Sequence, residues 1–188
     1  HFFEYIVYEG RKYMKILLFV TSIKDTLING EEKDYKNLIN NIDKIMELND
    51  NDLAFISFCD ATENRNVMLF HARKMINYMN GKRIFFGEQF LGDVHYKDLD
   101  SGALVYKNLR LDKIKEIINY IKKMQSNGNE VEVIVADGNM DIDEYKEEFK
   151  KNINCPFSFI YNIFNVREIN DTLTELYEIK EKDLNLKN

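Results

Sequence analysis

The sequence predicts an α/β fold of the Rossmann-like, doubly wound kind, with a mainly parallel sheet and helices on both faces. Short, nearly continuous apolar runs alternate along the chain with longer segments of helical period. Apolar runs without polar alternation are typical of strands buried on both faces, as in parallel sheets. The length of 188 residues suits one such unit, since domains usually hold about 100–150 residues.

The elements follow in order. A first strand is expected at residues 15–21, and apolar residues at helical spacing then predict a helix over residues 34–48. A second buried strand at 52–58 precedes a helix over 66–79, which Gly81 ends. The alternation continues with strands at 82–86, 103–106, 131–135 and 157–161, and with helices at 111–124, 143–151 and 170–179. Crossovers between such parallel strands are right-handed.

Residues 14–188 are expected to form a single domain. The irregular stretch 87–102 is too short for a full cap domain, so the carboxyl edge of the sheet should be open. Residues 1–13 precede a natural opening of the first strand, and we interpret them as a leader, an addition to the natural chain or an extra edge strand. No apolar run approaches the ~20 residues of a membrane-spanning helix, and no signal-peptide pattern occurs.

Charge and cysteine usage restrict the partners and the compartment. A net charge of -6 and a pI of about 5.2 argue against a broad electrostatic grip on nucleic acid, which needs clustered Lys and Arg. Cys59 and Cys155 fall in segments that look buried and have no metal-type spacing, which fits a reducing compartment. We expect a soluble, cytoplasmic protein without a disulfide or a membrane partner.

Carboxylates follow three of the expected strands. Open parallel sheets bind ligands beyond the carboxyl ends of their strands, and Asp25, Asp60 and the pair Asp137 and Asp141 stand there. Neighbouring carboxylates repel one another unless a cation lies among them, and hard oxygen ligands suit Mg²⁺. Asp137 and Asp141 are the predicted metal ligands. The alternative is that Asp141 and Asp143 cap a helix and that the others are turn residues.

The later part of this pattern resembles the haloacid dehalogenase-like (HAD) superfamily of phosphohydrolases. In that family a second strand ends in Thr or Ser, a Lys opens the helix before the next long strand, and that strand ends in a Gly-Asp-x-x-x-Asp loop. Lys113 opens the helix over 111–124, and the loop from Ala136 to Asp141 follows the acidic motif with Ala for the usual Gly. The resemblance makes Thr62, or less closely Ser57, the phosphate-binding hydroxyl.

The first motif departs from the family's Asp-x-Asp-x-Thr. Matching the family's Thr to Thr26 puts Ser22 at the nucleophilic Asp and Lys24 at the acid/base Asp. In the family the first Asp attacks phosphorus and ligates Mg²⁺, and the second protonates the leaving group. A serine without a nearby base is not activated. The Lys24 ammonium, close to Asp137 and Asp141, would partly replace the charge of the metal.

The sequence therefore predicts a catalytically impaired HAD-like protein that binds a phosphorylated small molecule or acts as a regulatory pseudo-enzyme, with Ser22, Thr62 and Lys113 on the phosphate. An alternative is an active Mg²⁺-dependent phosphatase that uses Asp25 or Asp60 together with Lys113. A third is a Rossmann-like nucleotide sensor or a protein-interaction domain.

Other residues have plainer interpretations. His71 and Cys59 are interpreted as structural. Arg65 and Arg73 are interpreted as solvated, with contact to an anionic ligand as the alternative.

Overall fold

The computed structural model describes residues 13–23, 26–59, 65–88, 90, 96–97, 104–105 and 109–187. The predictions for residues 1–12 and most of those for 87–102 lie outside these ranges. So do Lys24, Asp25, Asp60 and Thr62, whose roles therefore remain predictions.

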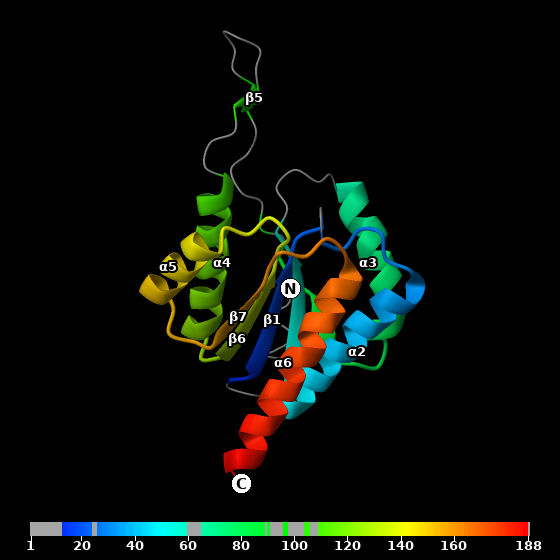
Figure 1. Ribbon diagram of the computed structural model, residues 1–188. Helices are drawn as coiled ribbons and strands as arrows, with labels where there is room; N and C mark the ends of the chain where they lie inside the picture. The colour runs from blue at the N-terminus through cyan, green and yellow to red at the C-terminus, as the bar shows by residue number, and fades with distance from the viewer. Residues whose placement is uncertain are drawn as a thin grey trace.

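Five parallel strands form one sheet in the order β3-β2-β1-β6-β7 (Figure 1). They span Lys15–Thr21 (β1), Leu53–Phe58 (β2), Ile84–Phe86 (β3), Glu130–Ala136 (β6) and Phe157–Ile160 (β7). The chain builds outward from β1 to β3 and then crosses back to β6, on the other side of β1. The topological switch point, where ligands bind in open α/β sheets, thus lies between β1 and β6.

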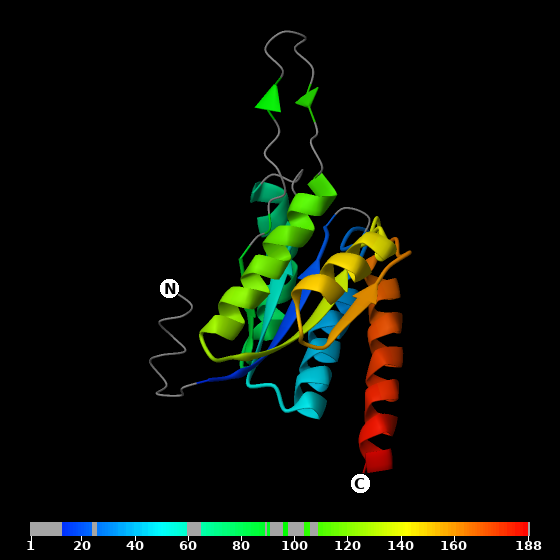
Figure 2. The ribbon, with the colours of Figure 1, turned by 90° about the vertical axis from the view of Figure 1, so that its left-hand side faces the viewer.

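Helices cover both faces of this sheet (Figure 2). One layer holds α2 (Glu32–Asn49), α3 (Arg65–Met79) and α6 (Val166–Lys187), and the other holds α4 (Leu109–Ser126) and α5 (Ile142–Asn152). A separate antiparallel pair, β4 (Tyr96–Lys97) and β5 (Leu104–Val105), lies between β3 and α4 in the sequence. The predicted doubly wound α/β class is confirmed.

The central strand explains why both faces need helices. Leu17 and Phe19 pack in the core under α2, α3 and α6, whereas Ile16, Leu18 and Val20 pack under α4 and α5. Successive side chains of a strand point to opposite faces, so one apolar run supplies two cores. Each such side chain contributes roughly 1.5–3 kcal/mol on full burial.

Two of the predicted elements differ clearly from the structure. The last helix, expected over 170–179, begins at Val166, and Asn165 starts it by accepting a hydrogen bond from the Glu168 N–H at 3.1 Å. The segment expected at 103–106 provides the two-residue β5, which pairs with β4 outside the main sheet. The partner strand β4 has only two residues, which is too short for a pattern of apolar residues to predict it.

Both cysteines are free thiols, as expected, with Cys59 buried and Cys155 half-buried. Within the described ranges, no helix combines the length and the apolar character needed to cross a bilayer.

Candidate functional site at the carboxyl edge of the sheet

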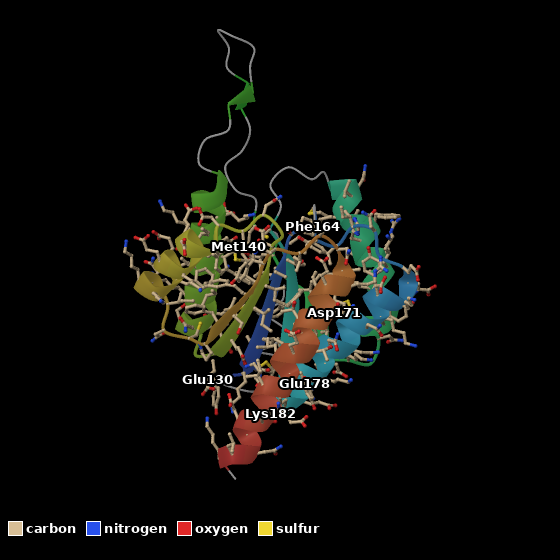
Figure 3. All side chains as sticks on the ribbon, in the orientation of Figure 1. Glu130, Met140, Phe164, Asp171, Glu178 and Lys182 are labelled. Carbon is tan, nitrogen blue, oxygen red and sulfur yellow. The ribbon has the colours of Figure 1, made fainter. Side chains whose placement is uncertain are left out.

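The candidate site lies at the edge of the sheet where the parallel strands end. In Figure 3, Met140 and Phe164 mark this edge, in the loops that follow β6 and β7, and Glu130 at the start of β6 marks the opposite edge. The loops after β1 and β6 flank the switch point, and they carry most of the predicted site residues that the structure describes.

These two loops are joined by backbone and hydroxyl contacts. The Ser22 N–H donates to the Ala136 carbonyl at 3.0 Å, and the Gly138 N–H donates to the Thr26 hydroxyl at 3.2 Å. The hydroxyls of Ser22 and Thr26 also hydrogen-bond to each other, and both side chains are buried. Thr26 is therefore the connecting residue of the site, a role that the sequence pattern did not assign to it.

The carboxylate of Asp137 is held by two donors. Its Oδ1 accepts from the Asn139 N–H at 3.1 Å, and its Oδ2 accepts from the Lys113 ammonium at 2.9 Å. The side chains of Lys113 and Asp137 are 15% and 5% exposed, so the pair is largely shielded from water. The structure thus brings Ser22, Lys113 and Asp137 into one connected set at the carboxyl edge of the sheet, and the roles assigned to these residues remain predictions.

Asp141 has a different local role. It is the N-cap of α5, and its Oδ1 accepts from the Glu144 N–H at 3.2 Å. This agrees with the capping alternative, and Asp143 and Glu144 are acidic residues of the first turn, where the helix dipole favours them. Among the residues that the structure describes, no three His, Cys, Asp or Glu side chains gather in a group suited to a metal ion. The role of Asp137 and Asp141 as Mg²⁺ ligands remains a prediction.

Ser57, the second choice for the phosphate-binding hydroxyl, is fully buried near the end of β2. Within the described part of the chain its Oγ has no hydrogen-bond partner. The backbone of Gly87 passes so close that a Cβ there would lie 2.4 Å from this oxygen and 3.6 Å from the Tyr120 hydroxyl. Burial, with the charge of Glu88 as a smaller cause, raises the pKa of Tyr120 to about 12, so this hydroxyl stays protonated.

No protein-family model matches this sequence, and no curated protein matches it. A solved structure described as "Structure of MT0777" is similar over 87% of this chain and 97% of that chain, with a TM-score of 0.42 and 10% identity. A likeness this distant identifies neither a family nor a function. The site must be judged by its own geometry.

Proposed function

We propose that the site at the switch point binds a phosphorylated small molecule and does not hydrolyse it. The ion pair between Lys113 and Asp137 carries the proposal. This pair holds an ammonium group at the edge where open α/β sheets bind ligands. The hydroxyls of Ser22 and Thr26 belong to the hydrogen bonds that join the loops at the same edge. A phosphate carries more negative charge than the Asp137 carboxylate and competes with it for Lys113.

The hydroxyl at the end of β1 is the reason to propose binding without turnover. Serine is a weak nucleophile until a general base takes its proton, whereas a carboxylate needs no such step. In the resemblance to the HAD superfamily, a carboxylate occupies this position and attacks phosphorus. Replacing it with Ser22, beside a Lys113 that already neutralises Asp137, favours a site that retains phosphate affinity and has lost the reaction.

Calorimetric titration with inorganic phosphate, p-nitrophenyl phosphate and a nucleoside monophosphate tests the proposal. Lys113→Met should abolish binding, whereas Asp137→Asn should tighten it roughly tenfold, because it removes a like charge that competes with phosphate for the ammonium. Tighter binding by Asp137→Asn is not expected of a residue that only stabilises the fold. Lys123→Met, on the exposed side of the same helix, is the matched control and should bind as the wild type does.

The same probes with Mg²⁺ separate this proposal from the active phosphatase. Release of p-nitrophenol that depends on Mg²⁺ and disappears in Asp137→Asn would show that the site hydrolyses phosphate esters. It would favour the alternative in which another carboxylate, such as Asp25 or Asp60, takes part in the reaction. A probe that binds only the folded protein must raise the melting temperature of that protein. If none of the three probes raises it, the site does not bind phosphate and the proposal is wrong.

A further inference from the structure

The segment from Arg65 to Arg83 is positively charged, whereas the molecule as a whole is negatively charged. It holds five basic residues and no Asp or Glu, in a chain whose net charge is -6. The basic residues are Arg65, Arg73, Lys74, Lys82 and Arg83. Most of the segment is α3, which lies beside α2 (Figure 1). It also contacts β3, the edge strand of the sheet.

The outer side of α3 is also unusually apolar. Leu69, Phe70 and Ile76 are 41%, 57% and 50% exposed. Leu69, Arg73 and Ile76 follow one another at spacings of four and three residues, so they share one face of the helix, and Lys74 lies one turn after Phe70. We call these five residues the α3 face. The inner side, with Ala72 and Met75, is buried in the core.

A pocket of about 280 Å³ opens beside the α3 face, between α3 and the start of α2. Its lining comprises Gly30, Glu32, Tyr35, Arg73, Lys74, Asn77 and Tyr78. The Lys74 ammonium lies 4.8 Å from the centre of the Tyr35 ring and 4.3 Å from that of Phe70, so two aromatic faces hold its charge in place.

The charges of this pocket are not balanced. Among the described residues that line it, the one carboxylate is that of Glu32, which accepts a hydrogen bond from the Tyr78 hydroxyl. Neither Arg73 nor Lys74 forms an ion pair with a carboxylate in the part of the chain that the structure describes. Two cations thus face a single carboxylate that already has a hydrogen-bond donor.

We propose that the α3 face and this pocket form a docking surface for an acidic, amphipathic segment of a partner protein. An apolar side chain of the partner packs on Leu69, Phe70 and Ile76, and a neighbouring carboxylate enters the pocket to meet Arg73 and Lys74. Charge complementarity selects the occupant. The segment that forms this surface is basic, although the molecule as a whole is acidic, so an acidic partner is attracted to this surface. This surface involves none of the residues of the phosphate site, so the two proposals stand separately.

The geometry favours a protein segment over a lipid surface or a nucleic acid. The pocket is a recess between two helices, with hydroxyl and amide groups beside its cations, and it suits a single side chain rather than a flat surface. Recognition of anionic lipid usually uses about four to eight clustered basic residues. The α3 face presents two, and the other three basic residues of the segment lie at the first position of the helix (Arg65) and beyond its far end (Lys82 and Arg83).

Selection from a displayed library of random 16-residue peptides on the immobilised full chain tests this surface. Enriched peptides should combine Asp or Glu with Leu, Ile or Phe. In fluorescence anisotropy, Arg73→Glu/Lys74→Glu should weaken the best peptide at least about tenfold, and added salt should weaken it further. Lys122→Glu/Lys123→Glu, an equal charge change on exposed lysines of α4, should leave binding unchanged.

Several results would overturn the proposal. They are the absence of enriched peptides, the enrichment of basic ones, and equal losses in the two double variants. Binding to phosphatidylserine vesicles or to RNA that Arg73→Glu/Lys74→Glu abolishes, without peptide enrichment, would assign the surface to those partners instead. Concentration-dependent dimerisation that the same variant abolishes would make a second copy the occupant. Circular dichroism melting confirms that each variant is folded.

Discussion

The Lys113 ammonium and the Asp137 carboxylate meet at 2.9 Å beyond the end of β6, and the rest of the chain covers most of both side chains. Removing one partner leaves a charge without its counter-ion in a site that water reaches poorly. We expect Lys113→Met to lower the free energy of unfolding by roughly 2–4 kcal/mol. Lys151→Met breaks an ion pair to Glu147 that is exposed on both sides, and should cost less than about 1 kcal/mol.

Urea unfolding of a double-mutant cycle measures the pair itself. The loss in Lys113→Met/Asp137→Asn should be smaller than the sum of the two single losses, by about 0.5–3 kcal/mol. Strictly additive losses would mean that the two charges do not support each other in solution.

His71 should make stability depend on pH. Burial, and secondly the charge of Lys74, lowers the pKa of His71 to about 4, against about 6.5 in an unfolded chain. Between these values the unfolded chain binds a proton that the folded one does not, so stability falls as the pH drops from 6.5 to 4. The loss should be on the order of 2–3 kcal/mol.

Unfolding of the wild type and of His71→Gln at pH 7.5 and pH 4.5 isolates this contribution, because other titrating groups are common to both proteins. The wild type should lose more stability than the variant over this interval. An imidazole signal that titrates near pH 6.5 in an NMR experiment would contradict the prediction.

Gly87 should not tolerate a side chain while Ser57 stands opposite. The Cβ of Gly87→Ala would lie 2.4 Å from the Ser57 Oγ, and overpacking of this kind costs about 1–3 kcal/mol. Ser57→Ala alone should change stability by less than about 1 kcal/mol, since within the described residues its hydroxyl has no hydrogen bond to lose. Thermal unfolding of Ser57→Ala/Gly87→Ala should show most of the loss recovered. A double variant no better than Gly87→Ala would place the clash elsewhere.

Cys155 should react slowly with alkylating reagents. Burial raises the pKa of its thiol, and the thiolate is the reactive species. At pH 8 we expect iodoacetamide to modify the folded chain at least about tenfold more slowly than the chain in urea, with mass spectrometry as the measurement. Equal rates would show that the segment between α5 and β7 opens readily.

The fold could be predicted from the sequence because local patterns, such as short apolar runs, mark its elements. The apolar run from Ile16 to Val20 needs two covering layers wherever it lies, and the residues after β1 and β6 must then share an edge. That edge also places Lys113, near the start of α4, close to Asp137, although the sequence pattern did not predict an ion pair between them. The joining of the loops by Thr26 does not follow from that edge, because it depends on strand order and on loop conformation, which no local pattern specifies.

The sequence left the role of Arg73 on α3 open between solvation and contact to an anionic ligand, for a related reason. A basic residue such as Arg73 is common on solvated helices, and only the packing of α2 beside α3 gives it a pocket with Tyr35 and Tyr78. The start of α6 carried a local signal, Asn165 three residues before Glu168, that an expectation built on apolar spacing alone does not use.

The central position of β1 also has a consequence for synthesis of the chain. Its first partner, β2, follows directly after α2. Its second partner is β6, and the ladder between them cannot begin until Glu130, which pairs with Lys15, has been synthesised. A nascent chain that has not yet reached β6 holds an apolar strand with one open edge, which is a template for pairing with other chains. Ribosome-bound fragments ending before residue 130 should therefore depend on chaperones, and the completed chain should not.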